Sequence, residues 1–130
     1  MQKYTQKQLE AMSNAEIDAA IAERFGLKWS AYTVFPNPAP VFPQSYDRIQ
    51  VKKKYGAYAV TQDFSPTERI QDGIPIAHKY GISSIYIDGK FKYAELNLGQ
   101  SNIQSINHRT YDENPLRAAM IVFLLLEEGE

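Results

Sequence analysis

The chain has 130 residues, 44% of them hydrophobic, and this size and composition predict a single globular domain over 1–130. Its 14 basic and 15 acidic side chains give a net charge of −1. This balance argues against binding of a nucleic-acid polymer, although a local basic patch remains compatible with it. The absence of cysteine excludes a disulfide framework and thiol chemistry. The polar stretch Met1 to Lys7 lacks the apolar run of a signal peptide, so we expect the cytoplasm and no membrane contact.

The first helix is indicated by a capping box. Ser13 and Glu16 have the required spacing, and they predict a helix over residues 14–25. Apolar side chains recur on one face of it, at Ile17, Ile21 and Phe25. Gly26 follows, where a left-handed residue would end the helix.

The segment 28–46 has no clear period. It contains four prolines and several aromatic rings, and we expect a long loop. One interpretation is that these rings only cover the core. The other is that they form a binding surface, and the sequence leaves both open.

Two β-hairpins are expected in the middle of the chain. Residues 48–54 and 57–62 alternate between apolar and polar side chains, which predicts two strands joined by a tight turn. Residues 82–87 and 90–98 flank Asp88-Gly89, a pair that suits a two-residue type I′ turn.

A short helix is expected between these hairpins. Ser65 and Glu68 form a second capping box, with Pro66 at the first helical position. Gly73 and Pro75 should interrupt this helix, because proline lacks the N–H that a helix interior requires.

The strongest prediction concerns the last helix. Asn114 can cap it and Pro115 suits its first position, and residues 115–126 are apolar except for Arg117. Such a helix is buried on all sides, and at ~1.5 Å per residue it is too short to cross a ~30 Å hydrocarbon core. We therefore expect an α+β fold: an antiparallel sheet of hairpins with a buried C-terminal helix and an N-terminal helix packed on it.

Several motifs together resemble a known family. They are Ile17 to Leu27, Phe64 to Thr67, Asp72 to Ile76, Gly81 to Ser83, and Asn114 to Met120. This set resembles the small phage proteins of the NinX type, whose function is unassigned. The chain departs from that family near Ile70 and Gln71, where a tryptophan is often found. The resemblance implies a phage accessory protein in the cytoplasm of a bacterial host, and it brings no known reaction and no catalytic residues.

The search for chemistry finds few candidates. His78 and His108 are far apart in sequence and have no partner motif, so we expect no metal and no cofactor. There is no G-x-S-x-G elbow and no glycine-rich phosphate loop. Carboxylates are available as general acids or bases, but sequence spacing does not pair them, and an enzyme is the less favoured interpretation.

Arg117 is the residue that most needs explanation, because the dipole of a helix disfavours a cation in the first turn. It can form an ion pair with Asp112 or Glu113, or it can bind an anion together with the free N–H groups of the same helix end. On the second interpretation the site contains Arg117, Asn114, Arg109, His108, Trp29, Tyr32, Phe35 and Thr67.

Three functions remain open at this stage. The first is non-catalytic binding of a small phosphate-bearing, anionic, nucleotide-like ligand by a homo-oligomer (a dimer or higher), which would sequester a host defence signal. The second is a protein–protein interaction module that targets a host factor through its aromatic segment. The third is a small nucleotide hydrolase.

Overall fold

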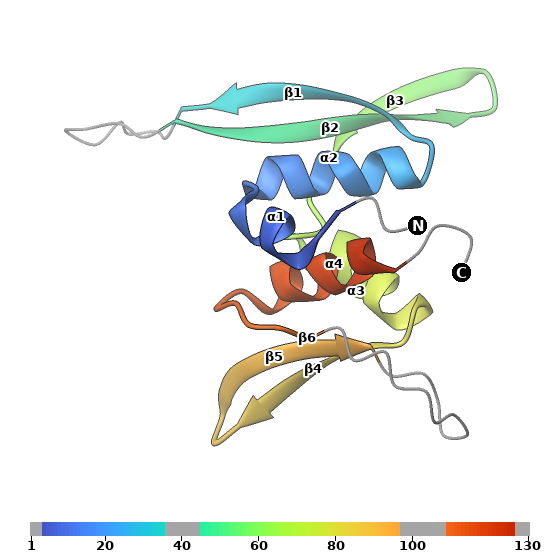
Figure 1. Ribbon diagram of the computed structural model, residues 1–130. Helices are drawn as coiled ribbons and strands as arrows, with labels where there is room; N and C mark the ends of the chain where they lie inside the picture. Colours follow the sequence, from blue (N-terminus) through green and yellow to red (C-terminus); the bar gives the residue numbers. More distant parts are fainter. Residues whose placement is uncertain (1–3, 36–44, 97–108, 127–130) are drawn as a thin grey trace.

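The structure is a computed structural model that describes residues 4–35, 45–96 and 109–126. It is built in layers, with a three-stranded sheet on one side, helices in the middle and a second three-stranded sheet on the other side (Figure 1). Both sheets are antiparallel. The α+β class is confirmed, with the hairpins divided between two sheets.

The N-terminal helices begin and end as their caps require. Helix α1 spans Gln6–Ala11 and helix α2 spans Asn14–Arg24. The side chain of Ser13 accepts from the backbone N–H of Glu16 at 3.2 Å, and Glu16 accepts from the N–H of Ser13 at 3.0 Å. After α2 the chain reverses at Gly26, where φ is +70°. The predicted helix over 14–25 is therefore confirmed.

Sheet A contains β1 (Lys28–Val34), β2 (Tyr46–Tyr55) and β3 (Tyr58–Asp63), in the order β1-β2-β3. The prediction of a loop from residue 28 onward was wrong for 28–34. Side chains alternate along this segment, and pairing with β2 satisfies its backbone groups on one edge. The prolines of the predicted loop lie outside the described residues.

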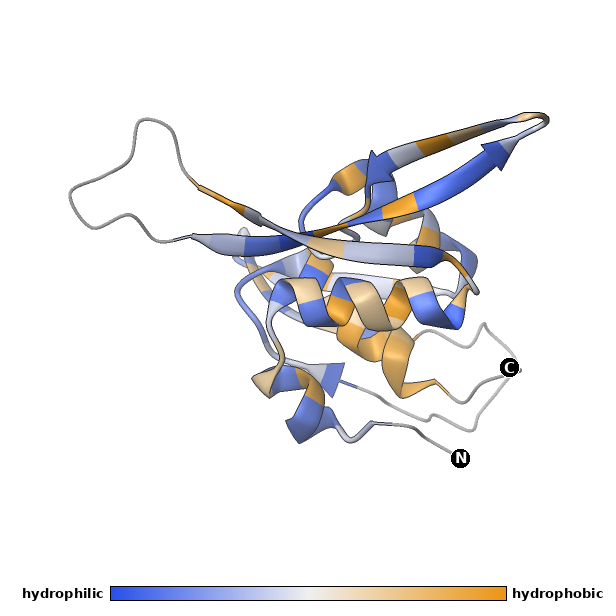
Figure 2. Ribbon diagram, turned by 90° about the horizontal axis from the view of Figure 1, so that it is seen from above, coloured by the Kyte–Doolittle hydropathy of each residue, from blue (hydrophilic) through white to orange (hydrophobic). Residues whose placement is uncertain are grey.

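One face of sheet A packs on α2 and the other is open. Ile49 and Val51 are 2% and 0% exposed, and they point toward α2. The register places Trp29 opposite Val51, so Trp29 is on the helix side. Toward its turn, the β2–β3 hairpin extends beyond the helices, as both views show (Figures 1 and 2).

The middle helix differs from its prediction. Residues 65–68 form a turn, and α3 spans Ile70–Lys79 without interruption, with Pro75 inside it. The expected capping box was wrong because Ser65 and Thr67 bind residues of other elements, described below, instead of capping a helix. Gly73 is buried in α3, facing the carbonyl of Pro66, and packing of this kind holds the helix despite Pro75.

Sheet B contains β4 (Ile82–Ile87), β5 (Lys90–Leu96) and the short β6 (Arg109–Thr110). Asp88 and Gly89 have φ values of +54° and +77°, as a type I′ turn requires. The predicted hairpin is confirmed within the residues that the structure describes.

Helix α4 (Pro115–Leu125) is the centre of the molecule. Eight of its 11 residues are buried, and it contacts α2, α3 and sheet B. Figure 2 shows it as the most continuously hydrophobic element. Asn114 caps it by accepting from the N–H groups of Leu116 at 3.0 Å and Arg117 at 3.3 Å, so the predicted start is confirmed. Within the described residues, no helix has the length and apolar character needed to cross a membrane.

Candidate functional site

Arg117 joins three parts of the chain. Its Nε donates to Asp112 at 2.8 Å, and its Nη1 donates to the side-chain oxygen of Asn14 at 2.8 Å. Its Nη2 donates to the carbonyls of Met12 at 2.7 Å and Glu10 at 3.1 Å, at the end of α1. Of the two interpretations that the sequence left open, the structure shows the ion pair with Asp112. The guanidinium is thus occupied by acceptors of its own chain.

Thr67 and Asn114 lie close to this arginine, in the same polar network. Asn114 donates from Nδ2 to the carbonyl of Thr67 at 2.9 Å. The backbone N–H of Thr67 donates to Asp18 at 3.0 Å, and the hydroxyl of Ser65 donates to the same carboxylate at 2.8 Å. We call Asp18, Ser65, Thr67, Asn114 and Arg117 the polar hub. Its hydrogen bonds connect α2 and the start of α4 to the turn at 65–68.

Asp18 is the carboxylate at the centre of the polar hub, and its pKa is shifted. Burial raises the pKa of its carboxyl to about 6, although hydrogen bonds from Ser65 and Thr67 partly oppose this. A serine hydroxyl beside a carboxylate is a possible nucleophile and base. However, both Asp18 and Ser65 are only 2% exposed, so no substrate reaches them in this conformation. The pair therefore serves the fold.

Sequence reasoning did not identify Asp18. It lies between Ile17 and Ala19 in a helix that is buried over most of its surface. A charged residue within such a stretch is a usable signal, because a buried carboxylate needs partners. The residues that serve as its partners are distant in sequence, so the signal would have marked Asp18 but not Ser65 or Thr67.

Two other predicted site residues lie elsewhere. Arg109 is on β6 of sheet B, where it forms an ion pair with Glu95 at 3.3 Å and lies over the ring of Tyr93 at 4.8 Å. His108 lies outside the described residues. Arg109 therefore does not join Arg117 in one site.

The three aromatic candidates are all on or beside β1, but they do not converge. Trp29 lies on the helix side of sheet A and Tyr32 on the open side, while Phe35 follows β1 and is 71% exposed. The hydroxyl of Tyr32 donates to Asp63 at 2.5 Å, and this bond raises the pKa of Tyr32 by favouring the protonated phenol. Arg69 lies 3.8 Å from the same carboxylate.

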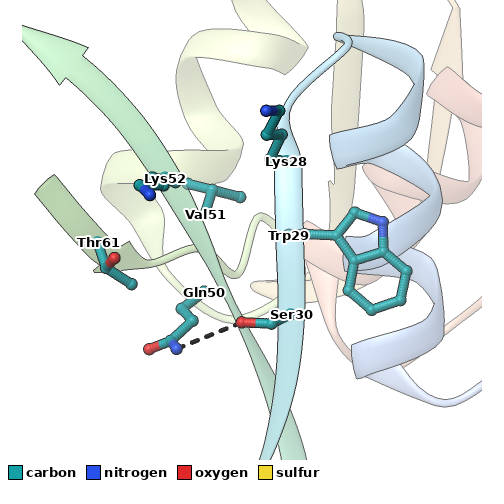
Figure 3. A pocket seen from close by; sticks show the side chains of 7 residues that line it. All are labelled: Lys28, Trp29, Ser30, Gln50, Val51, Lys52 and Thr61. Atoms are coloured by element: carbon teal, nitrogen blue, oxygen red, sulfur yellow. Dashed lines mark hydrogen bonds between the residues drawn. The ribbon is translucent and has the colours of Figure 1, made fainter. Parts of the chain in front are cut away.

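The open face of sheet A carries a shallow hollow of about 170 Å³. Its lining is formed by Lys28, Trp29, Ser30, Gln50, Val51, Lys52 and Thr61 (Figure 3). The register pairs Lys28 with Lys52, Ser30 with Gln50, and Lys52 with Thr61, so these side chains share one face. Gln50 donates to Ser30 at 3.3 Å, and the indole of Trp29 extends to the other side of β1 (Figure 3).

The two lysines have no carboxylate partner among the described residues. Two ammonium groups beside hydroxyl and amide groups have the chemistry to hold an anion, since all of these can donate hydrogen bonds. The sequence does not point to this hollow, because the prolines and rings of 28–46 predict a loop and not a strand. The usable signal was the alternation of Lys28, Ser30 and Tyr32 with Trp29 and Ala31.

Metal binding has no support in the part of the chain that is described. Across residues 4–35, 45–96 and 109–126, no three histidine or acidic side chains are grouped so that they could hold an ion. The carboxylate of Asp18 is instead bound by hydroxyl and backbone donors, and that of Asp112 by the guanidinium of Arg117.

The comparison with protein families gives one match. The family described as Bacteriophage P22, NinX matches residues 9–127, which is nearly the whole chain. The comparison with curated proteins finds no match. The matched range covers the polar hub and all six strands.

Proposed function

Because the chain belongs to the NinX family of bacteriophage proteins, we propose that it is a phage accessory protein that binds a small phosphate-bearing, nucleotide-like ligand without catalysis. The ligand binds in the hollow of sheet A, between Lys28 and Lys52. The observation that carries this proposal is the pair of lysines, directly opposite each other and without a carboxylate partner among the described residues.

The position of these lysines supports a binding role. Like charges directly opposite each other on neighbouring strands destabilise a sheet. An anion placed between Lys28 and Lys52 offsets this repulsion, and it gains charge-assisted hydrogen bonds from both. A pair that costs stability in the free protein and favours the bound state is expected at a binding site.

The neutral side chains of the hollow add the remaining contacts. Ser30 and Thr61 supply hydroxyl groups, and Gln50 supplies an amide that can donate to phosphate oxygens. A volume of about 170 Å³ holds a phosphate and part of the group attached to it. The rest of the ligand lies over the open face.

The biological role that we propose is sequestration, and membership of a phage family is compatible with it. A phage protein that binds a nucleotide-like ligand in the cytoplasm of its bacterial host can lower the free concentration of a host defence signal. Sequestration requires binding only, and therefore no general acid, base or metal.

The test is a thermal-shift titration with inorganic phosphate and with mono-, di- and cyclic nucleotides. A ligand that binds only the native state raises the melting temperature by mass action, by several degrees at ~100 times its Kd. Lys28→Ala and Lys52→Ala should abolish the shift, and Lys92→Ala, an exposed lysine on sheet B, should leave it unchanged. The proposal is wrong if no nucleotide raises the melting temperature of the wild-type protein.

A second candidate function is supported by exposed rings on the helix side of sheet A. Tyr55 and Tyr58 are 56% and 76% exposed, and Trp29 is 39% exposed. Such rings are common anchors of protein interfaces. Under this alternative the chain docks on a host protein, and a Tyr55→Ser/Tyr58→Ser variant should lose the partner that the wild type captures from bacterial lysate. The hydrolase alternative predicts turnover of the nucleotide in the same titrations, visible by chromatography.

A further inference from the structure

The open face of sheet A has the layout of a binding platform. Helix α2 covers one face of this sheet, and no described helix or strand covers the other (Figure 1). Along β2, the side chains on the open face are Tyr46, Arg48, Gln50, Lys52 and Lys54. The face therefore has an aromatic ring at one end of β2 and three basic side chains along the rest, with the neutral Gln50 between Arg48 and Lys52.

The basic groups follow one line along the strand. Residues two positions apart on a strand lie ~6.6–6.8 Å apart, so Arg48, Lys52 and Lys54 are spaced at one or two such steps. This interval is comparable to the distance between successive phosphates of an extended nucleic-acid strand. Lys54, like Lys52, has no carboxylate partner among the described residues. A lengthwise row of cations suits a ligand with several phosphates.

Acidic groups do not cancel this row. Asp63 is on the same face, but it accepts from Tyr32 and lies 3.8 Å from Arg69. Glu68 lies 3.6 Å from Arg48 and offsets only that end of the row. The net charge of −1 is a sum over the whole chain, and it is compatible with one face that is locally basic.

Two tyrosine rings, Tyr46 and Tyr32, offer stacking surfaces near the first residue of β2. Tyr46 is 44% exposed, and the guanidinium of Arg48 lies 5.5 Å from its ring centroid. Tyr32 is held in place by its bond to Asp63. Bases stack on aromatic rings and on guanidinium planes whatever their sequence, which makes such a group suitable for an unpaired strand.

We propose that the open face of sheet A binds a single-stranded nucleic acid, with phosphates on Lys52 and Lys54 and a base stacked on Tyr46. This inference rests on the proposed function, because the hollow between Lys28 and Lys52 becomes the site of one phosphate of that strand. From Tyr46 to Lys54 the face is ~27 Å long, and this suits about four nucleotides. A duplex fits less well, because its bases are not available to the rings.

The test is fluorescence anisotropy with a labelled oligothymidylate of ~10 nucleotides, competed by thymidine monophosphate and by a duplex of the same length. We expect the single strand to bind at least tenfold more tightly than the mononucleotide. Tyr46→Ala should weaken it roughly tenfold, and Lys54→Ala should reduce the salt slope of log K by ~0.7.

Matched variants separate this inference from the proposed function. Lys54 lies outside the hollow, so Lys54→Ala should weaken the oligonucleotide and leave the mononucleotide unchanged. Lys92→Ala and Tyr86→Ala, exposed residues of sheet B, are controls for charge and for ring loss. All these side chains are at least partly exposed, so the variants should fold, and circular dichroism will check this.

Each result of the binding experiment decides for or against one of the two proposals. If the mononucleotide binds at the two lysines and the single strand binds no more tightly, the inference fails and the proposed function stands. If the duplex competes as well as the single strand, the inference also fails. If the single strand does not bind, the inference fails; the proposed function fails with it only if no nucleotide raises the melting temperature in the thermal-shift titration.

Discussion

Arg117 provides the sharpest test of how this fold is held together, and the substitution to make is Arg117→Lys beside Arg117→Ala. Both remove the guanidinium that joins the end of α1 to Asp112 and Asn14. Lysine keeps the charge, but it has one donor atom and does not reach all three sets of acceptors. The two variants therefore separate the contribution of the charge from that of the shape.

The expected magnitude follows from what each variant leaves unpaired. Arg117→Ala leaves the carboxylate of Asp112 without its cation, and its side chain is only 22% exposed. Breaking a buried pair by removing one partner costs ~3–5 kcal/mol. The carboxylate has some access to water, so we expect the lower half of that range. Arg117→Lys keeps one charged contact and should cost ~1.5–3 kcal/mol, the value of one hydrogen bond to a charged group.

Urea unfolding followed by circular dichroism measures both values, and Arg109→Ala is the control. Arg109 also pairs with a carboxylate, but the two side chains are 45% and 26% exposed, and such a pair is worth ~0–1 kcal/mol. If Arg117→Ala costs no more than Arg109→Ala, the structural role assigned to Arg117 is wrong. Loss of nucleotide binding in Arg117→Lys at unchanged stability would instead support the anion site that the sequence suggested.

Three further predictions address other parts of the fold. Burial raises the pKa of Asp18 to about 6, so the folded state takes up a proton before the unfolded state as the pH falls. The free energy of unfolding should therefore increase by ~1 kcal/mol as the pH falls from 7 to 5, and this gain should disappear as the pH rises again through 6. Asp18→Asn should remove this pH dependence in urea titrations. Gly73→Ala should destabilise by ~1–3 kcal/mol despite the better helix propensity of alanine, because its Cβ would lie within 2.3 Å of the carbonyl oxygen of Pro66; an unchanged urea midpoint would contradict this. Light scattering should show a homo-oligomer of the 14.8 kDa chain that Tyr55→Ser/Tyr58→Ser converts to a monomer, and a monomeric wild type would exclude this interface.

The sequence predicted local structure well wherever local chemistry decides it. The caps at Ser13 and Asn114 and the turn at Asp88-Gly89 depend on side chains within four residues of one another. These caps and this turn could therefore be predicted from the sequence. The same is true of the burial of α4, since an uninterrupted apolar stretch has no polar face to expose.

The errors arose where distant partners decide the structure. The segment 28–34 becomes a strand because β2 pairs with it, and β2 begins only after the four prolines between residues 36 and 43. Ser65 has the spacing of a helix cap, but its hydroxyl donates to Asp18, 47 positions earlier in the chain. Tertiary contacts override a local preference when they satisfy a group that would otherwise be buried without a partner.

The candidate site was the least predictable part, for a related reason. Three of the five motifs that carry the family resemblance, Asp72 to Ile76, Phe64 to Thr67 and Asn114 to Met120, meet at or near the polar hub in the structure. They are recognisable because packing allows few alternatives there. A binding face needs only charge and exposure at the right register, and many side chains satisfy that requirement.

This difference gives variants of the two regions separate signatures. A substitution in the polar hub acts on α2, on which sheet A is packed, so it lowers stability first and affects ligands only through unfolding. A substitution of Lys28, Lys52 or Lys54 removes an exposed charge and leaves the packing intact, so binding should fall while the urea midpoint stays the same or rises. A rise is specific to the opposed pair, because relief of repulsion is expected for Lys28→Ala or Lys52→Ala but not for Lys92→Ala on sheet B. An exposed lysine whose removal stabilises the protein and abolishes binding would show that this face is kept for its ligand and not for the fold.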